Sequence, residues 1–453
     1  MGQAFSSDAR HAVAVVGAAV AGSEVARILA SRGAAVVVIE QNRAPYGKIE
    51  DGLPRWHVQQ RLDEYRAIDA RLSQPGIEYL PLTGLGRDIS FDELVSGWGL
   101  SAVVLCHGAW RDRPLPVPGA DQFVGRGLVY QNSFIYWFNH YWEPGYSGPQ
   151  YEPLPRTLVV GGGLASLDVV KVLQIETTLR ALAARGVKED MVRLEREGLE
   201  PALAAHGLRW AELDIAPCKL IYRRTVLDMP LSDIDPAAGS RRVELMRQAR
   251  AKILDKARRK YLFDFEQLRL PSGLLVENSR LTGLLVSRTE VVGTAVKVVP
   301  DSEERLRAPM VISSIGSIPE PIEGIAQKGE VYRFLDPTTG LLSDGPTAVF
   351  AAGNVLTGKG NIKDSLDNAT FVGTHVAERY LGLVEGALDL GQAERERAAA
   401  QGERIAAAVA GRVPLPAERV RAVAARVRER QRAVGYDGDY RAWIARAMPG
   451  RKP

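Results

Sequence analysis

The chain has few cysteines, no large excess of charge of one sign and no long apolar run. Its 453 residues include only two cysteines, Cys106 and Cys218, which form neither a CxxC pair nor a metal-ligand cluster. We therefore expect a reducing, cytoplasmic environment and no metal site or iron–sulfur cluster on this chain. Basic and acidic side chains number 58 and 54, so the net charge of +4 does not indicate nucleic-acid binding.

The apolar segments are too short to cross a membrane. The longest of them near the N-terminus runs from Ala12 to Gly22, and the charged residues Glu24 and Arg27 follow at once. A spanning helix needs about 20 apolar residues, so no membrane span is expected. The length indicates more than one domain, and the 44 glycines indicate tight turns and close approaches of backbone to ligand.

Residues 12–41 predict one unit of strand, helix and strand. AVAVV at 12–16 is typical of a buried parallel strand, a helix is expected over 23–32, and AVVVIE at 35–40 forms the second strand. Such a unit carries a nucleotide when the turn before its helix is rich in glycine.

The turn between that strand and helix resembles a dinucleotide-binding fingerprint. Gly17 is expected to make the tight turn and Gly22 to let the helix pack closely, while Ala19 replaces the middle glycine. The helix N-terminus would then present N–H groups to a pyrophosphate. Glu40, followed by Gln41, ends the second strand, and its carboxylate would accept hydrogen bonds from ribose and repel a 2′-phosphate. This site is expected to hold FAD or NAD, not NADP.

A second unit of the same kind begins at RTLVVGGGLASLDVV, from residue 156. The residues of its turn expected to contact nucleotide are Gly161, Gly163, Leu164, Ala165 and Ser166. The next strand, CKLIYRRT at 218–225, ends in Arg223 and Arg224. Because guanidinium groups match a phosphate dianion, this pair is expected to select the 2′-phosphate of NADP. A solvated basic loop is the alternative.

An acid-ended unit followed by an arginine-ended unit resembles the flavoproteins with two dinucleotide-binding domains. Within that group the sequence most resembles the adrenodoxin-reductase type of ferredoxin–NADP reductase, to which the glutamate synthase small subunit is related. The resemblance covers roughly residues 10–380. Four more segments carry it: PYGKIEDGLPRWH (45–57), SAVVLCHGAW (101–110), VISSIGSIP (311–319) and AVFAAGNVLTGKGNIKDSLDNA (348–369).

The resemblance implies FAD in the first site and NADP(H) in the second. Beyond the glycine turn, it implies FAD contacts at Gly47, Lys48, Ile49, Gly108, Gly353, Asn354, Gly360, Asn361 and Ile362. Asn354 stands where the relatives carry aspartate or tryptophan, and its amide can still form hydrogen bonds. Hydride is then expected to pass from NADPH to the flavin, which carries the difficult chemistry.

Three residues are candidates for a direct part in that chemistry. Lys48 would add positive charge near the reduced flavin. His57 is the best candidate for handling protons, because histidine titrates near neutral pH. Asp235 matches an acid that the family carries beyond its arginine pair, with Asp233 as the neighbouring choice. The alternatives are a solvated surface lysine, a packed loop histidine and a turn or capping aspartate.

The expected fold class is α/β, with two doubly wound, three-layer, Rossmann-like domains. The FAD domain is expected to be discontinuous, over 10–115 and 335–385, with the NADP domain over 116–334. Residues 386–453 are rich in Ala, Arg and Glu and are expected to form a helical extension. Its segment 417–434 has one apolar helical face, made of Val420, Val423, Ala424 and Val427.

The expected function is an NADPH-dependent reductase that passes electrons from FAD to a ferredoxin-like iron–sulfur protein. The strongly basic segment 240–260 suits an acidic carrier, and its expected buried side chains are Val243, Met246, Ile253 and Leu254. Two alternatives stay open. One is a reductase of a small organic substrate or a supplier of electrons to a dedicated partner subunit, and the other is a flavin-binding scaffold without turnover. A homodimer also stays open.

Overall fold

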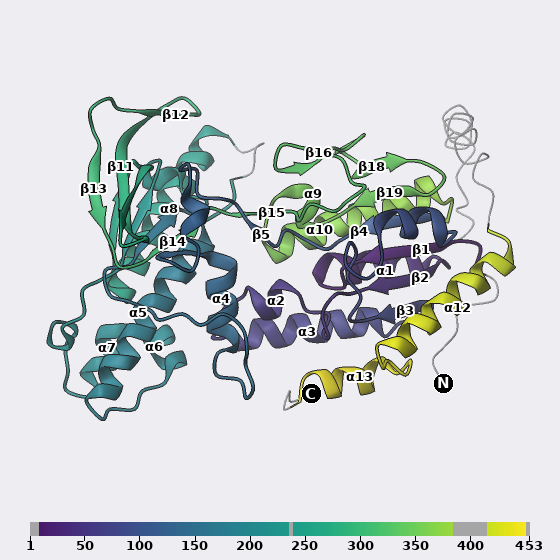
Figure 1. Cartoon of the computed structure of the whole chain (residues 1–453), viewed down its shortest axis with the longest axis horizontal. Coiled ribbons are helices and arrows are strands. Elements are labelled where there is room, and N and C mark those ends of the chain that lie inside the picture. Colours follow the sequence, from purple (N-terminus) through teal and green to yellow (C-terminus); the bar gives the residue numbers. More distant parts are fainter. Residues whose placement is uncertain (1–8, 235–238, 384–414, 450–453) are drawn as a thin grey trace. The chain divides into compact units, whose positions relative to one another are not determined.

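The computed structural model describes residues 9–234, 239–383 and 415–449. Their backbone forms two compact units, and the chain passes from one to the other more than once (Figure 1). The first unit takes the described residues of Met1–Glu50, Val58–Arg111 and Ile318–Pro453, and the second takes those of Asp51–His57 and Asp112–Ser317. Within these ranges, every helix is too short or too polar to cross a membrane.

The first unit is built on a six-stranded sheet that is parallel except at one edge. In spatial order its strands are β18 (Leu341–Asp344), β19 (Ala348–Ala351), β4 (Ala102–Leu105), β1 (Ala12–Val16), β2 (Ala35–Ile39) and β3 (Ile77–Leu80). In the centre, Val16 of β1 lies opposite both Ile39 of β2 and Leu105 of β4. All five residues of β1 are buried, as its β-branched run predicted.

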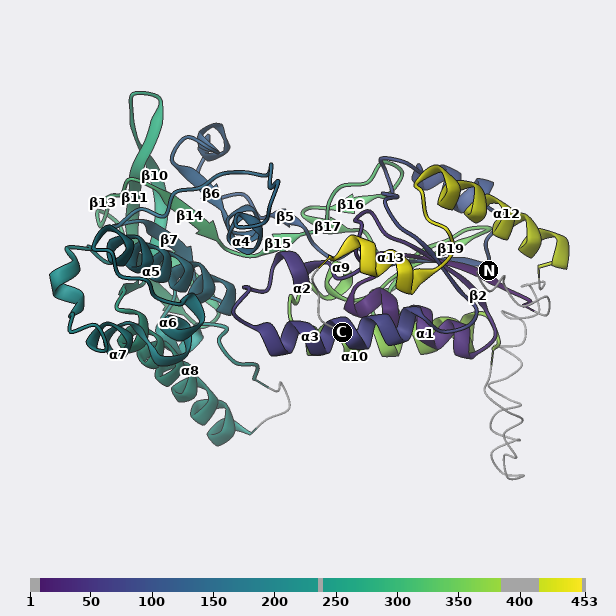
Figure 2. The ribbon, with the colours of Figure 1, turned by 90° about the horizontal axis from the view of Figure 1, so that it is seen from below.

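Helices cover both faces of this sheet and give the unit three layers. One apolar core joins the sheet to α1 (Val20–Ser31), α3 (Val58–Leu72), α10 (Ile362–Thr374) and α13 (Tyr440–Ala447). The core on the opposite face includes α12 (Ala417–Ala433). Figure 2 shows α1, α3 and α10 along one side of the sheet and α12 on the other. The four side chains expected on the apolar face of α12 are buried, so that prediction is confirmed.

The second unit contains a five-stranded parallel sheet. Its strands, in spatial order, are β6 (Leu128–Tyr130), β14 (Val311–Ser314), β7 (Leu158–Gly161), β8 (Lys219–Tyr222) and β9 (Asp264–Gln267). The helices that join the core on one face include α4 (Gln131–His140), α5 (Leu164–Ala184) and α8 (Ser240–Tyr261). The strands on the other face are β10 (Arg269–Glu277), β11 (Arg280–Val292), β12 (Ala295–Val298) and β13 (Glu304–Arg307), which pair antiparallel. The predicted fold class, with two Rossmann-like domains, is confirmed.

The two units divide the chain differently from the expected domain bounds. The chain re-enters the first unit at Ile318 and not at 335, because Tyr332 of β17 (Val331–Tyr332) is buried in that unit's core. The loop Asp51–His57 groups with the second unit, where the Arg55 N–H donates to Asn139 Oδ1 at 2.9 Å. The described part of the C-terminal extension, α12 and α13, packs into the first unit's cores. The assignment of the units to FAD and NADP stays a prediction.

Helix α8 buries less of its predicted face than the sequence indicated. Leu254 is buried, but Ile253 is 36% exposed, and Val243 and Met246 are only half-buried. The prediction was wrong for these three side chains because the apolar packing of α8 begins only at Leu254, with Ala257 and Tyr261 as the other buried residues. In the first half, polar contacts replace it, and Arg250 donates to backbone carbonyls of the preceding loop.

Candidate functional site

The first glycine turn lies at the carboxyl end of β1, in the centre of the parallel sheet. Gly17 has a φ of +95°, and a Cβ added there would lie 2.7 Å from the Cys106 carbonyl oxygen. A Cβ added to Gly22 would lie 1.7 Å from the Gly17 carbonyl oxygen. Any side chain would therefore separate the helix α1 from the turn, so both positions require glycine. The turn thus has the close packing that the fingerprint predicted.

Ala19 explains how the turn tolerates the loss of its middle glycine. It caps α1 with a φ of −70°, which any residue adopts. Its methyl group points to a second loop, because a Cβ added to Gly47 would lie 3.0 Å from Ala19 Cβ. A third loop arrives from β19, where a Cβ added to Gly353 would lie 2.6 Å from Ala21 Cβ. Three segments far apart in sequence therefore meet at the N-terminus of α1.

The carboxylate of Glu40 lies beside the same turn. The side chain is 4% exposed, and its Oε2 accepts a hydrogen bond of 2.9 Å from the Ala18 N–H. Its Oε1 accepts another of 2.9 Å from the Asn42 N–H. This geometry holds a negative charge at the carboxyl end of β2, next to the N-terminus of α1. Gln41, in contrast, is exposed.

The short helix α2 (Lys48–Asp51) follows Gly47 and begins with a positively charged residue. Lys48 Nζ lies 5.5 Å from the centroid of the Trp110 ring, within range of a cation–π contact. The Ile49 N–H donates to the Tyr46 carbonyl at 3.0 Å, so it is already used within the turn. Gly108 has a φ of +74°, and a Cβ there would come no closer than 3.9 Å to Trp110 Nε1. The Ile49 N–H is thus occupied within the turn, and the Lys48 ammonium group supplies a positive charge beside it.

The segment after β19 leads into a short helix and then into α10. Asn354 begins α9 (Asn354–Thr357), and its Oδ1 is buried without a hydrogen-bond partner among the described residues. Asn361 caps α10, because its Oδ1 accepts from the Asp364 N–H at 2.7 Å. That N–H is therefore occupied. On either side of Asn361, Gly360 is exposed and Ile362 is half-buried. A buried acceptor without a partner is uncommon, so Asn354 is a candidate to accept a hydrogen bond from a ligand.

His107 also lies at the first site, and the sequence did not predict it. His107 follows β4, and a Cβ on Gly17 would lie 2.7 Å from its Cα. Its Nε2 lies 3.0 Å from the Tyr332 hydroxyl, which itself donates to the Glu320 carbonyl at 2.5 Å. Burial lowers the pKa of His107 to about 4, so the ring is neutral at pH 7. The sequence feature that could have indicated His107 as a site residue is its position between Cys106 and Gly108 in SAVVLCHGAW.

The second glycine turn lies at the carboxyl end of β7. A Cβ on Gly161 would lie 2.2 Å from the Ser314 carbonyl oxygen, whereas on Gly163 the nearest atom would be 3.9 Å away. Ser166 is fully buried, and its hydroxyl donates to the same Ser314 carbonyl at 2.9 Å. Leu164 is 55% exposed, and Ala165 beside it is half-buried. Gly163, unlike Gly161, therefore has no crowded neighbour at this position, and it lies at the helix N-terminus, where a phosphate group would bind.

Arg223 and Arg224 follow β8, which pairs in parallel with β7. The pair therefore lies at the same sheet edge as the second glycine turn. Arg224 Nη2 donates to the Thr294 carbonyl at 2.6 Å. The Arg223 side chain is exposed and makes no ion pair with any residue that the structure describes. One guanidinium is thus anchored and the other is available to an anion.

His57 lies in the second unit with acidic and basic neighbours that the sequence did not predict. Asp168 of α5 is one of them, and Lys171 Nζ lies 3.2 Å from its Oδ1. Burial raises the pKa of Asp168, and the charges of Lys171 and His57 oppose that rise. Asp168 stands two residues beyond Ser166, on the first turns of α5. Asp235 lies outside the described residues, and Asp233 is exposed.

A second histidine of this unit predicts a pH-dependent stability. His140 is 8% exposed, and its ring nitrogens contact Asp51 Oδ1 at 3.0 Å and Glu143 Oε1 at 2.8 Å. Burial alone lowers the pKa of His140, but these two hydrogen bonds outweigh it and raise the pKa above 6.5. A raised folded-state pKa stabilises the protein below the unfolded pKa, and this contribution disappears as the pH rises through the folded pKa.

We therefore expect His140→Gln to lower the melting temperature most near pH 6 and progressively less above pH 7. The measurement is the difference in melting temperature between wild type and variant across that range. His375→Gln is the control: burial lowers the pKa of His375, so the loss of this histidine should not reproduce the trend. A difference for His140→Gln that stays constant with pH would contradict the assignment.

Comparisons with known proteins agree with this architecture. No protein-family model matches the chain. In sequence it is 27% identical over 381 residues to the mitochondrial NADPH:adrenodoxin oxidoreductase of Arabidopsis thaliana, which covers 75% of this chain and 76% of the relative. It is also 32% identical over 126 residues to the NADH glutamate synthase of Schizosaccharomyces pombe, a match covering 27% of this chain and 6% of that protein.

Among solved structures, the chain is similar to Mycobacterium tuberculosis FprA in complex with NADPH. The TM-score is 0.61 at 17% sequence identity, and the match covers 88% of this chain and 90% of that one. This likeness supports the fold. Taken with the sequence match, it confirms the predicted resemblance: the chain is similar in sequence to an adrenodoxin oxidoreductase and in fold to FprA.

Proposed function

We propose that this protein is an NADPH-dependent flavoprotein reductase, with FAD in the first site and NADP(H) in the second. The observation that carries the proposal is the contrast between two strand ends: Glu40 beside one glycine turn, Arg223 and Arg224 at the other. A carboxylate repels a 2′-phosphate and accepts hydrogen bonds from ribose hydroxyl groups, whereas guanidinium groups attract that phosphate. The similarity to NADPH:adrenodoxin oxidoreductase supports the same assignment.

The residues of the first site fit FAD. Asn354 Oδ1 is a buried acceptor without a described partner, and the hydroxyl groups of a ribityl chain are donors that would satisfy it. Gly17, Gly47 and Gly353 keep side chains away from the N-terminus of α1, where a pyrophosphate would bind. The Glu40 carboxylate would accept hydrogen bonds from the hydroxyl groups of the adenosine ribose.

A bound flavin supplies hydride and electron transfer, and the protein supplies orientation and charge. Lys48, held over the Trp110 ring, places a positive charge beside the Gly47 turn. His57 is our candidate for moving a proton, with the charges of Asp168 and Lys171 near it. Asp235 stays a prediction as an alternative acid.

The proposed electron acceptor is an acidic, ferredoxin-like iron–sulfur protein. The first half of α8 exposes Arg241 and Arg242, and a basic surface of this kind speeds association with an acidic carrier. The partial similarity to glutamate synthase favours one alternative, in which electrons pass to a dedicated partner subunit. A cytoplasmic location stays a prediction that rests on the two cysteines, which are unpaired and buried.

Anaerobic mixing of the yellow protein with NADPH tests the proposal. We expect rapid bleaching of the flavin absorbance with NADPH and much slower bleaching with NADH. Cytochrome c reduction should then require added ferredoxin, and its rate should fall steeply with salt concentration. A purified protein without flavin, or one whose flavin NADPH does not bleach, would contradict the proposal. Reduction of a small molecule without ferredoxin would favour the alternative.

A substitution at His57 tests its part in the reaction. We expect His57→Gln to slow flavin reduction by NADPH by roughly 100-fold, the lower end of what a positioned acid or base contributes. The variant should also lose the step near neutral pH in the profile of this rate. The affinity for NADPH, measured in the same variant, separates binding from rate. An unchanged rate and an unchanged pH profile would remove His57 from the mechanism.

A further inference from the structure

The C-terminal segment, residues 415–449, contacts the loop that joins the two ends of the first site. This loop, the 40–47 loop, begins at Glu40, whose carboxylate accepts from the glycine turn, and ends at Gly47, which lies against Ala19. Both ends of the loop therefore belong to the first site, and any support for the loop bears on the geometry of that site.

Two hydrogen bonds join helix α13 to this loop and to its neighbour α3. Trp443 Nε1 donates to the Arg43 carbonyl oxygen at 2.7 Å. The Tyr440 hydroxyl donates to Asp69 Oδ1 at 2.9 Å, and the same oxygen accepts from the Tyr46 hydroxyl at 2.9 Å. The loop is thus fixed directly at Arg43 and, through a shared carboxylate, at Tyr46.

The aromatic donors of these bonds are largely buried, whereas Asp69 is half-buried. Tyr46 is fully buried, and Trp443 and Tyr440 are 6% and 9% exposed. Burial, and then the charge of Asp69, raise the pKa of Tyr440, so its hydroxyl stays protonated and donates at any pH of interest. Hydrogen bonds to a carboxylate are among the stronger ones in proteins.

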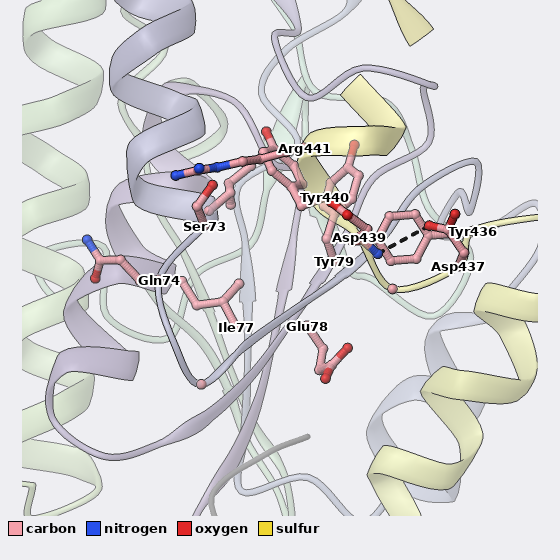
Figure 3. Close-up of a pocket in the computed structure, with 13 residues that line it drawn as sticks. Ser73, Gln74, Ile77, Glu78, Tyr79, Tyr436, Asp437, Asp439, Tyr440 and Arg441 are labelled. Atoms are coloured by element: carbon pink, nitrogen blue, oxygen red, sulfur yellow. Dashed lines mark hydrogen bonds between the residues drawn. The ribbon is translucent and has the colours of Figure 1, made fainter. Parts of the chain in front are cut away.

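The rest of the segment holds α13 in place. Gln431, near the end of α12, donates to the Tyr79 carbonyl in β3 at 2.9 Å. The rings of Tyr440 and Tyr79 meet edge to face, 5.2 Å between centroids. Figure 3 shows Tyr436, Tyr440 and Tyr79 at this junction, beside a pocket of about 340 Å³ lined by residues of 72–79 and 436–441. The segment therefore has anchors of its own on β3, independent of the 40–47 loop.

We infer that the C-terminal segment is a positioning element for the first dinucleotide site, in which Trp443 and Tyr440 hold the 40–47 loop in the shape that binds FAD. The inference rests on the proposed function for the identity of the ligand. It assigns a role to the helical extension, which the sequence left without one, and it makes Asp69 the link between Tyr440 and the loop.

Two variants and one matched control test this inference. Tyr440→Phe and Trp443→Phe each remove one hydrogen bond while they retain an aromatic ring. Tyr436→Phe is the control, because it makes the same change in the same segment at a hydroxyl for which the described residues provide no hydrogen bond. The first readout is the FAD dissociation rate, which is measured from the recovery of flavin fluorescence. We expect it to rise roughly three- to tenfold in both variants and to stay unchanged in the control.

A double-mutant cycle distinguishes positioning from general destabilisation. If Tyr440 acts through Asp69, the effects of Tyr440→Phe and Tyr46→Phe on FAD dissociation will not add, because both hydroxyls serve one oxygen. NADP(H) affinity, a property of the second unit, should be unchanged throughout. Wild-type dissociation rates in Tyr440→Phe and Trp443→Phe would overturn the inference, and additive effects would overturn the link through Asp69.

Hydrogen–deuterium exchange provides a readout that does not depend on FAD. In the ligand-free full-length protein, peptides covering residues 41–49 should exchange faster in both variants than in wild type or the control. Equal exchange in all four proteins would overturn the positioning role. A wild-type protein that binds no FAD would instead contradict the proposed function, while the exchange comparison would still decide whether the segment holds the loop.

Discussion

Replacement of both Arg223 and Arg224 with alanine is expected to weaken NADPH binding by about 2–4 kcal/mol and to leave NADH binding nearly unchanged. The reason is that Arg223 is exposed and Arg224 is anchored to the Thr294 carbonyl, both at the carboxyl end of β8. Only NADPH carries the 2′-phosphate that two guanidinium groups bind with charge-assisted hydrogen bonds. The measurement is the ratio of the dissociation constants for the two nucleotides.

The control for this double variant is the pair Arg241→Ala and Arg242→Ala. It makes the same change in net charge on exposed positions of the same unit, at the start of α8. If the loss of affinity comes from specific contacts, the control keeps the wild-type preference for NADPH. A double variant at Arg223 and Arg224 with that preference intact would show that the basic pair is a solvated loop.

Gly22→Ala is expected to release FAD and to destabilise the first unit by roughly 3 kcal/mol or more. The added Cβ would lie 1.7 Å from the Gly17 carbonyl oxygen, a backbone atom that cannot turn away as a flexible side chain can. Helix α1 must then move from the turn, and the N–H groups at its N-terminus move with it. The measurements are the flavin content of the purified protein and its melting temperature.

Gly163→Ala in the second turn is the matched control for stability. Its nearest neighbour would be 3.9 Å from the added Cβ, and its φ of −89° suits alanine. We expect a melting temperature close to wild type, with any loss confined to NADP(H) affinity. A Gly22→Ala protein with normal flavin content and normal melting temperature would mean that α1 does not pack on the turn as described.

Periodicity and turn residues were sufficient to predict the two nucleotide-binding units. The strand β1 occupies the predicted residues, and β2 ends one residue before the predicted Glu40. Such elements are predictable because their apolar patterns and glycines act locally, on neighbours within one turn. Helix α1 began at Val20, three residues before the predicted start, because the glycine turn itself completes the first helical turn.

Contacts between distant segments were not predictable from local pattern. The loop Asp51–His57 was expected beside the first site, yet it groups with the second unit through hydrogen bonds to Asn139. Asp168 was missed because a single acid in a helix has no signature until its neighbours are known. The prediction of a buried face along α8 was wrong because an amphipathic pattern shows which side of a helix can be buried. It does not show how far along the helix a packing partner extends.

What the sequence determined by itself is the chemistry of the two turns: glycines where a Cβ would collide with backbone, an acid after one strand and two arginines after another. These are properties of residue type and short spacing. Only the tertiary structure decided that Ala19 points to Gly47, that the Asn354 amide oxygen lacks a described partner, and that the C-terminal helices reach the 40–47 loop. Such facts depend on packing between segments that are separated along the chain, by 28 residues for Ala19 and Gly47 and by 400 for Arg43 and Trp443, and local preferences carry no information about such packing.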